Sequence, residues 1–423
     1  MTHPTHPMRP RRRLLQALAA APLAGLWPGP SRAAPTGRVV VVGGGMAGAT
    51  VAKYLRLWGG SGVDVTLVER ESRYTSCIMS SLVLSGQRSL DSLRFGYEGL
   101  VQRHGVKLRT GTVQAIDPVL RQVTLADGRK LTADRLVLAP GIDFDAVPGL
   151  GNADRMPHAW KAGPQTTLLR RQLLALPTRG TVLLTIPRTP YRCPPGPYER
   201  ACLLADWLRV NKPGARLVVL DANPDFVTEK DNFSEAFFGL HAGVIEYHTN
   251  AEVLSADPAT MTLQTTAGNF RGDVINLIPR QRCSPLLSAA GLANATEGRF
   301  AGVNVLNYES TAVAGVHVIG DSSATTQPKA GHIANQEAKT CADAILRAFE
   351  GLGPDPQPVT NSACFSTISM REASWLEAVF QYNPATGLMQ PVPEASGASV
   401  GWSAGGFEDM GTWFRSLMAD TFA

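Results

Sequence analysis

The sequence predicts an α/β protein with two domains of the strand–helix–strand type, followed by a C-terminal α+β domain. Apolar, β-branched runs at residues 38–42 and 181–186 each precede a helical pattern and a second strand. The chain has 423 residues, which is more than one ordinary hydrophobic core holds. Its composition, 44% hydrophobic and 18% charged, is that of a folded globular protein.

The first 34 residues are predicted to be an export signal. Arginines at 11–13 precede an apolar stretch at 17–27 and small residues at 31–34. This order is typical of a signal peptide, and the adjacent arginines favour the twin-arginine route. A transmembrane anchor is the alternative, but the stretch is shorter than the ~20 residues that span a bilayer. We therefore expect a periplasmic protein whose mature chain has no integral membrane segment.

A glycine-rich turn follows the first predicted strand. Gly43, Gly45 and Gly48 match G-x-G-x-x-G, and the next strand ends at Glu69 after a helical pattern. The first glycine permits the tight turn, the second admits a pyrophosphate, and the third lets helix and strand pack closely. The helix N-terminus then faces the phosphates, and the glutamate accepts hydrogen bonds from the ribose. The sequence therefore predicts a dinucleotide site.

Two later segments point to FAD rather than NAD. Residues 134–141 resemble the strand and Ala-Thr-Gly segment of flavoproteins that bind two dinucleotides. Residues 316–321 resemble the segment in which a strand of those proteins delivers an Asp to the ribityl chain, although Asp321 could also be an ordinary helix cap. The predicted non-covalent FAD contacts are Gly43, Gly45, Gly48, Glu69, Val113, Ala139, Gly141 and Asp321.

The second strand–helix–strand unit lacks a glycine-rich turn. Its first strand leads into a proline-rich segment, residues 187–197. Proline fixes φ and removes N–H donors, so this segment is a poor cradle for a pyrophosphate, and we expect no NAD. The predicted domains are the FAD-binding domain in two parts, 37–147 and 270–350, the second nucleotide-binding-like domain at 148–269, and the C-terminal domain at 351–423.

Composition and cysteine spacing exclude several function classes. The formal net charge is +5, part of it in the N-terminal arginines, so we expect no nucleic-acid partner and at most a small anionic substrate. None of the six cysteines lies in C-x-x-C-H or C-x-x-C. The chain is therefore expected to carry no c-type haem, zinc ribbon or other metal site.

Three segments, residues 74–77, 193–200 and 361–365, resemble the flavoprotein subunit of flavocytochrome c sulfide dehydrogenase. The resemblance extends over nearly all of the predicted mature chain. It implies two glutathione-reductase-like (Rossmann-like) domains. Further segments similar to that family are 158–163, 274–279 and 413–422.

The resemblance also implies site residues and partners. Cys77 would bond covalently to FAD, and Cys193 and Cys364 would form a redox-active disulfide beside Glu199. Hydrosulfide would attack this disulfide and leave as polysulfide or elemental sulfur, while electrons pass through FAD to a cytochrome c subunit with one haem or two. The residues alone leave alternatives: Cys77 as a buried thiol, Cys193 and Cys364 as a structural disulfide, and Glu199 as a partner of the helix dipole.

The cysteine chemistry can be argued from the residues as well. Cys193 precedes prolines that can open a helix, and the positive end of a helix favours a thiolate, so we expect a low pKa for this thiol. Glu199 can exchange protons with it. The remaining cysteines are expected to be buried thiols or an unassigned bridge; they are Cys202, Cys283 and Cys341.

Three other functions compete with this one. A sulfide:quinone oxidoreductase-like enzyme needs apolar or amphipathic C-terminal helices. Here, prolines and glycines follow Cys364, with only a short helical pattern near Trp413 and Phe414, which together with Trp402 are expected in the core. The proline-rich segment disfavours an NADH-dependent flavin reductase. A non-catalytic flavoprotein that binds a cytochrome or a sulfur carrier would not be bleached by sulfide.

Overall fold

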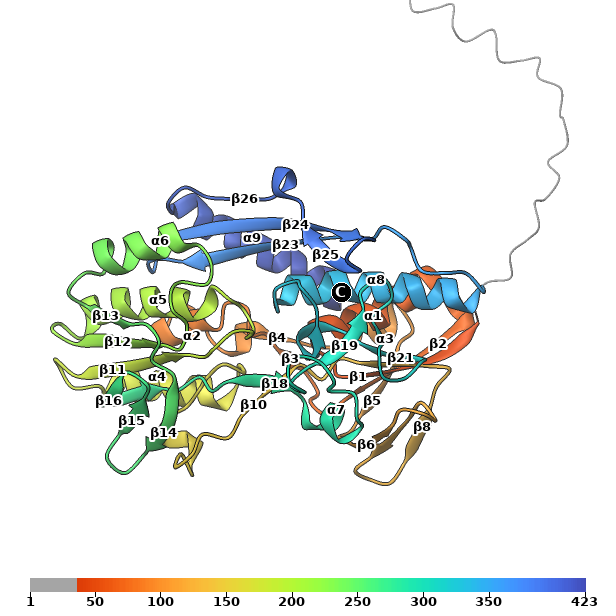
Figure 1. Cartoon of the computed structure of the whole chain (residues 1–423), viewed down its shortest axis with the longest axis horizontal. Helices are drawn as coiled ribbons and strands as arrows, with labels where there is room; N and C mark the ends of the chain where they lie inside the picture. The colour runs from red at the N-terminus through yellow and green to blue at the C-terminus, as the bar shows by residue number, and fades with distance from the viewer. Residues whose placement is uncertain (1–35) are drawn as a thin grey trace, which may run out of the picture. The chain divides into compact units, whose positions relative to one another are not determined.

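The largest sheet of the protein has eight strands and a parallel centre (Figure 1). We analysed a computed structural model that describes residues 36–423. The strand order is β22-β19-β20-β21-β9-β1-β2-β5, and the four strands from β21 to β2 pair in parallel. The bounds of these four are β21 (Val316–Val318), β9 (Arg135–Leu138), β1 (Gly37–Val42) and β2 (Val63–Glu69).

The central sheet joins two distant stretches of the chain. β9 pairs with β1 on one side and with β21 on the other, so strands from before and after the second unit share one sheet. The described residues, 36–423, form one compact unit, and the predicted domain limits stay predictions. The predicted export signal, residues 1–34, lies outside the described residues.

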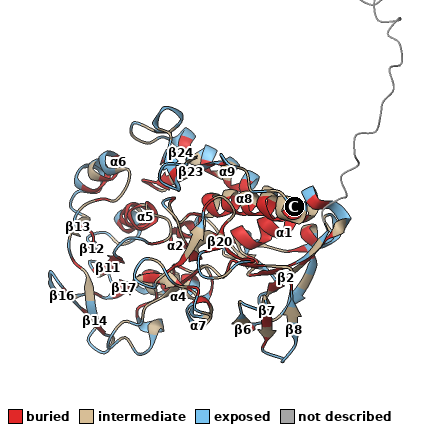
Figure 2. Cartoon of the chain, turned by 45° about the vertical axis from the view of Figure 1, so that its right-hand side comes forward, coloured by how far each residue is buried: buried red, intermediate tan, exposed pale blue. Residues whose placement is uncertain are grey.

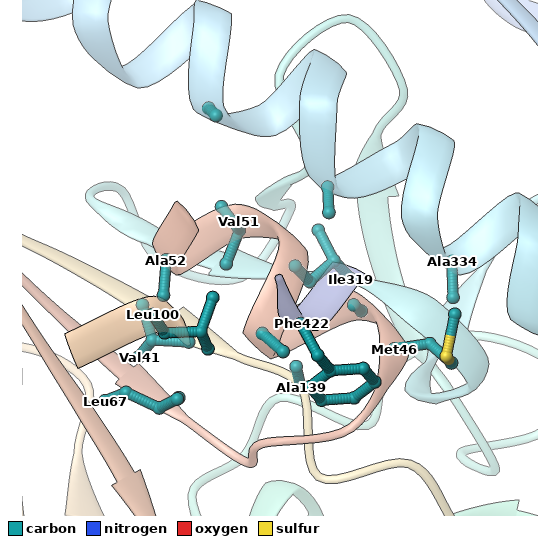
Figure 3. Close-up of a cluster of buried hydrophobic side chains, with 14 of the residues drawn as sticks. Val41, Met46, Val51, Ala52, Leu67, Leu100, Ala139, Ile319, Ala334 and Phe422 are labelled. Atoms are coloured by element: carbon teal, nitrogen blue, oxygen red, sulfur yellow. The ribbon is translucent and has the colours of Figure 1, made fainter. Parts of the chain in front are cut away.

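Two long helices cover the central sheet. α1 (Met46–Gly59) and α8 (Gly331–Phe349) pack against each other; α1 begins shortly after the central strand β1, and α8 follows the edge strand β22. Figure 3 shows apolar side chains from β1, β2, α1 and the C-terminus in one core, among them Val41, Leu67 and Phe422. β1 is buried along most of its length because its continuous run of valines has apolar neighbours on both faces.

The second unit is built on a four-stranded parallel sheet of order β13-β12-β11-β17. Helices α4 and α5 share a core with one face, and a three-stranded antiparallel sheet, β14-β15-β16, shares a core with the other. The bounds are α4 (Pro164–Ala175), β11 (Thr181–Ile186), α5 (Gly196–Asn211), β12 (Arg216–Asp221), β13 (Ile245–His248), β14 (Val253–Asp257), β15 (Thr262–Thr265), β16 (Gly268–Arg271) and β17 (Val274–Asn276).

The C-terminal part combines an antiparallel sheet with one helix. The sheet consists of β23 (Val359–Thr367), β24 (Ala373–Asn383), β25 (Leu388–Pro391) and β26 (Gly397–Ala398). The expected short helical pattern is in fact the 19-residue helix α9 (Ala404–Phe422), which packs against α1 and β24. Phe414 is buried, as expected for the core, whereas Trp402 and Trp413 are half-buried.

The predicted fold class is confirmed, and shorter elements complete the structure. Figure 2 shows that α1, α5 and α8 are largely buried. No helix among residues 36–423 is long and apolar enough to cross a membrane. The remaining bounds are β3 (Tyr74–Thr75), α2 (Ser81–Ser85), β4 (Arg94–Phe95), α3 (Glu98–Gln102), β5 (Lys107–Thr110), β6 (Val113–Asp117), β7 (Gln122–Leu125), β8 (Lys130–Thr132), β10 (Ile142–Phe144), α6 (Lys230–Glu235), β18 (Gln281–Cys283), α7 (Pro285–Ala289), β19 (Ala301–Asn304), β20 (Glu309–Ser310) and β22 (Ser323–Ala324).

Candidate functional site

A cavity of about 940 Å³ lies where the central parallel strands end and the helices α1 and α8 begin. Gly45 reaches it from the turn after β1, Ala139 from the end of β9, and Asp321 from the turn after β21. His332, in the first turn of α8, also lines it. The carboxyl edge of a parallel sheet is the usual position of a ligand site in such folds, and this cavity is large enough for one.

The glycine turn after β1 leaves space that side chains would fill. Gly43 has φ +99, and a Cβ there would lie 2.4 Å from the carbonyl oxygen of Ala139. A Cβ on Gly48 would lie 1.8 Å from the oxygen of Gly43, so only glycine fits this close packing. A Cβ on Gly45 would approach nothing within 3.8 Å and would instead enter the cavity that Gly45 lines. The turn is therefore an open cradle.

The residues around the cavity fit FAD. The N-termini of α1 and α8 both border it, and free N–H groups there favour phosphate. Glu69 ends β2 and lines the cavity, where its Oε2 accepts the N–H of Gly44 at 2.5 Å. Asp321 also lines the cavity. Burial raises the pKa of this carboxyl, while Arg192 and Lys329 oppose the rise.

Most of the predicted FAD contacts come together at this cavity. Its lining includes Gly43, Gly45, Glu69, Cys77, Ala139, Gly141 and Asp321. Gly48 acts through the close packing of α1 on the turn instead. Val113 begins β6 and is buried in the core beside β1, outside the lining of the cavity. Its assignment as an FAD contact stays a prediction.

Three of the six cysteines line the same cavity. Cys77 follows β3, Cys193 precedes α5, and Cys364 lies in β23, so three separate parts of the chain contribute one thiol each. All are free thiols in the structure, and the Sγ of Cys77 accepts the N–H of Ala162 at 3.4 Å. The expectation of buried thiols elsewhere is confirmed for Cys202, Cys283 and Cys341, all of which are fully buried and unpaired.

The backbone of Cys193 has an unusual conformation. Its φ is +59, in the left-handed region that non-glycine residues rarely occupy. Its N–H donates to the carbonyl of Lys329 at 2.6 Å, and its carbonyl accepts the N–H of Gly196 at 2.9 Å. The Sγ lies against Gly196, where an added Cβ would be only 2.8 Å away. The turn therefore presents the sulfur just ahead of α5.

The expected low pKa of Cys193 is wrong. Burial raises the pKa of this thiol well above its ordinary value; the charges of Glu199 and Cys364 add to the rise, and Arg192 opposes it. Burial also raises the pKa of Cys364, to about 12. Both cysteines line the cavity, and at Cys193 desolvation outweighs the dipole of α5. Both cysteines are neutral thiols when reduced.

Glu199 lies in the first turn of α5 and lines the cavity, as its spacing from Cys193 predicts. Burial raises its pKa to about 8; Arg200 opposes the rise and the nearby Glu229 adds to it. Glu199 is therefore a neutral acid at neutral pH and holds a proton beside the two cysteines.

Two arginines beside the cavity, the half-buried Arg192 and the buried Arg200, make contacts that the sequence does not predict. The Arg192 guanidinium donates to the carbonyl of Trp160, and the guanidinium carbon of Arg200 lies 4.7 Å from the Trp160 ring centre. Arg200 also donates to Asn276 Oδ1 and to the carbonyl of Ala159, both at 3.0 Å. Burial lowers its pKa to about 10. Arg200 lies in the quoted segment 193–200, but only the fold brings these partners to it.

Family comparisons match three parts of the described chain. Residues 37–174 match the pyridine nucleotide-disulphide oxidoreductase family. Residues 166–279 match the central part of the sulfide dehydrogenase [flavocytochrome c] flavoprotein chain, and residues 356–422 match the flavin-binding part of flavocytochrome c sulphide dehydrogenase. The sulfide dehydrogenase flavoprotein chain of Chlorobaculum thiosulfatiphilum is 52% identical over 48 residues, which are 11% of this chain and 98% of that sequence.

The chain belongs to the flavocytochrome c sulfide dehydrogenase flavoprotein family. The resemblance seen in the sequence is thereby confirmed, and so is the prediction of an FAD-dependent oxidoreductase class. A probable ferredoxin reductase, CtmF of Castellaniella defragrans, is 37% identical over 107 residues, which are 25% of this chain. The chain spans only 26% of that reductase's length.

Solved structures show the same fold. The sulfide:quinone oxidoreductase of Aquifex aeolicus superposes with a TM-score of 0.74 at 17% identity and covers 91% of both chains. Putidaredoxin reductase, in its covalent complex with putidaredoxin, has a TM-score of 0.63 at 21% identity over 82% of both chains. Identities this low establish the architecture and nothing about the substrate.

Proposed function

We propose that this flavoprotein oxidises hydrosulfide to polysulfide or elemental sulfur and passes the electrons through FAD to a cytochrome c subunit. One observation carries the proposal: Cys193, Cys364 and Glu199 line the same cavity as Gly45 and Asp321. A dithiol, a proton donor and a dinucleotide cradle therefore share one space. Membership of the flavocytochrome c family supports the substrate and the partner.

In the proposed oxidised state, Cys193 and Cys364 are joined by a disulfide. Hydrosulfide attacks one sulfur; a new S–S bond makes a persulfide on that cysteine, the original S–S bond breaks, and the other cysteine leaves as a thiolate. The buried thiols have raised pKa values, so this thiolate takes up a proton. Glu199, whose pKa is about 8, is the acid placed to supply it. Arg192 attracts the incoming anion.

A second hydrosulfide then takes the outer sulfur of the persulfide as hydrodisulfide and leaves a dithiol. Re-forming the Cys193–Cys364 disulfide releases two electrons and two protons, and Glu199, once deprotonated, accepts one of these protons. When bound, FAD supplies a two-electron acceptor next to the cysteines. The partner we propose for the final electron transfer is a cytochrome c subunit with one haem or two.

Cys77 is the proposed covalent anchor of FAD. Its thiol lines the cavity and its Sγ is oriented by the N–H of Ala162. Tyr74, Arg192 and Asp321 lie near Cys77. The charges of Cys77, Arg192 and Asp321 all act on the pKa of the Tyr74 hydroxyl. An anchor here would hold the cofactor between the cradle at Gly45 and the two redox cysteines.

The remaining proposals concern cofactors and location. The proline-rich segment 187–197 replaces the turn that would hold a second dinucleotide, so we propose that electrons do not come from NADH. The chain is proposed to carry no haem and to bind no nucleic acid. It is proposed to be periplasmic after export by the twin-arginine route. Its substrate is a small sulfur anion, of which hydrosulfide is the first choice.

Anaerobic addition of sulfide to the purified holoprotein tests the proposal. Sulfide is expected to bleach the flavin absorbance of the wild type but not of Cys193→Ser or Cys364→Ser. Cys202→Ala is the matched control, because Cys202 lies on the same helix as Glu199 but outside the lining of the cavity. Bleaching at the wild-type rate in Cys193→Ser would exclude the disulfide mechanism. Reduction of quinone rather than cytochrome c by the bleached protein would favour the quinone-linked alternative.

A further inference from the structure

The second unit has a buried carboxylate that the proposed chemistry does not use. Asp221 ends β12, the position at which dinucleotide-binding domains place the acid that holds the adenosine ribose. Here Asp221 is fully buried and faces the protein interior. Its Oδ2 accepts the hydroxyls of Tyr198 at 2.7 Å and Tyr247 at 2.8 Å, and its Oδ1 accepts the backbone and side-chain N–H groups of Asn223, both at 2.8 Å.

This carboxylate is connected to the turn that carries Cys193. The hydroxyl of Tyr198 donates to Asp221 and accepts a hydrogen bond from the hydroxyl of Tyr191. Tyr191 shares its one hydroxyl proton between Tyr198 and the carbonyl of Pro194, one residue after Cys193, which lies 3.1 Å from the Tyr191 oxygen. Tyr191 and Tyr198 are both almost completely buried, so water does not compete for these bonds.

The same strand end holds the start of the proline-rich segment. The side chain of Asn223 donates to the carbonyl of Pro187 at 3.1 Å and accepts the N–H of Thr189 at 3.2 Å. Asn223 is itself fixed by Asp221 Oδ1. Proline supplies no N–H, so this segment has few backbone donors of its own, and the side chain of Asn223, just after β12, anchors it.

The turn needs such anchoring because Cys193 has φ +59. A non-glycine residue persists in the left-handed region only where its surroundings hold it there. The bond from Cys193 N–H to the carbonyl of Lys329 and the bond from Arg192 N–H to the side chain of Gln281 tie the turn to the segments before α8 and in β18. The Tyr191–Pro194 bond holds it from the side of the second unit.

We infer that Asp221, through Tyr198 and Tyr191, is a positioning group for Cys193 and has replaced a ribose-binding role with a structural one in disulfide chemistry. The inference rests on the proposed function of Cys193. It explains why a nucleotide-binding-like unit is present beside a proline-rich segment: the end of β12 fixes the sulfur at the cavity. The carboxylate thus acts on the reaction by positioning Cys193 and does not touch the substrate.

Tyr191→Phe is the sharpest test, with Tyr247→Phe as its matched control. Both variants remove one phenol hydroxyl from the same buried network, but only Tyr191 contacts the Cys193 turn. Two quantities are measured on the holoprotein: the equilibrium of the Cys193–Cys364 disulfide with a reference dithiol, and the alkylation rate of Cys193 in the reduced protein. In Tyr191→Phe the equilibrium is expected to shift roughly fivefold toward the dithiol, the equivalent of one ordinary hydrogen bond, and alkylation to accelerate to a similar degree.

Tyr247→Phe is expected to leave both quantities at their wild-type values. Equal effects of the two variants, or no effect of Tyr191→Phe, would overturn the inference. Should Tyr191→Phe fail to fold, Tyr198→Phe removes the connection between Asp221 and Tyr191, and unchanged values of both quantities in this variant would overturn the role of Asp221. A wild type that forms no disulfide would instead refute the proposed function, while the alkylation rates would still decide whether Tyr191 positions Cys193.

Discussion

Replacing Glu199 by glutamine should remove one arm of the pH dependence of sulfide oxidation. Burial raises the pKa of Glu199 to about 8, so the wild-type side chain carries a proton below that pH and loses it above. A glutamine of the same size cannot donate a proton to the departing thiolate. General acids contribute roughly 10²- to 10⁴-fold, so the bleaching rate in Glu199→Gln should fall by at least ~100-fold near neutral pH.

The raised pKa of Glu199 should also make the free energy of unfolding depend on pH. The folded protein holds the proton of Glu199 up to pH of about 8, whereas an ordinary glutamic acid loses it near 4.5. Stability from this site is therefore fully present below pH 4.5 and declines as pH rises to about 8. At 1.36 kcal/mol per pKa unit, the full loss is at most about 5 kcal/mol. Glu199→Gln should become the more stable protein as pH rises through this window.

The assay is anaerobic stopped-flow bleaching of the flavin by sulfide over a range of pH, together with urea unfolding at the same pH values. Ionisation of hydrogen sulfide to hydrosulfide affects the bleaching rates of the wild type and of Glu199→Gln equally. The difference between the two pH profiles of bleaching therefore isolates the contribution of Glu199. Glu98→Gln serves as control because Glu98 is exposed on α3. A falling arm near pH 8 that persists unchanged in Glu199→Gln would refute the assignment of Glu199 as the acid.

Three further changes have expected outcomes. Cys77→Ser should release FAD into the supernatant after acid precipitation, whereas the wild type should keep a flavin mass on the Cys77 peptide; free flavin from the wild type would contradict the covalent anchor. Gly45→Val should fold but purify with little flavin, because its side chain enters the cradle, whereas Gly48→Ala should fail to reach a folded yield, because its Cβ meets Gly43 at 1.8 Å; a Gly45→Val protein with the flavin content of the wild type would contradict the cradle. Arg200→Met should lower the free energy of unfolding by about 3 kcal/mol in urea titration, because it leaves Asn276 Oδ1 and the carbonyl of Ala159 without their donor; an unchanged midpoint would mean that Arg200 contributes no net stability.

The parts of the site that the sequence predicts are those set by local chemistry. The β-branched run before Gly43 appears as β1, and the run at 181–186 appears as β11 with the same bounds. The sequence also predicts the glycine turn, because the turn requires a positive φ at Gly43 and close packing of Gly48 on Gly43, and these residues are near each other in the sequence. Glu199 was placed correctly for the same reason, since one helical turn fixes its distance from the proline-rich segment.

The parts that the sequence misses depend on contacts between distant segments. α9 contains several glycines, so its sequence predicts only a short helix. It is longer in the structure because Ser403 Oγ accepts the N–H of Gly406 at 3.0 Å and because α9 packs against α1 and β24. The pKa of Cys193 was predicted in the wrong direction because the helix dipole is visible in the sequence, whereas burial is not. Burial requires the fold to bring Trp160 and β23 around this thiol.

The two-part central sheet has a consequence for synthesis on the ribosome. β1, β2 and β9 emerge early, but β9 gains its second parallel neighbour only when Val316–Val318 has been made. The sheet of the second unit is complete by Asn276, so that unit can close first. A flavin that reached the nascent chain before residues 316–321 had been made would meet the glycine cradle but not Asp321. Stable cofactor capture therefore has to wait until most of the polypeptide has left the exit tunnel.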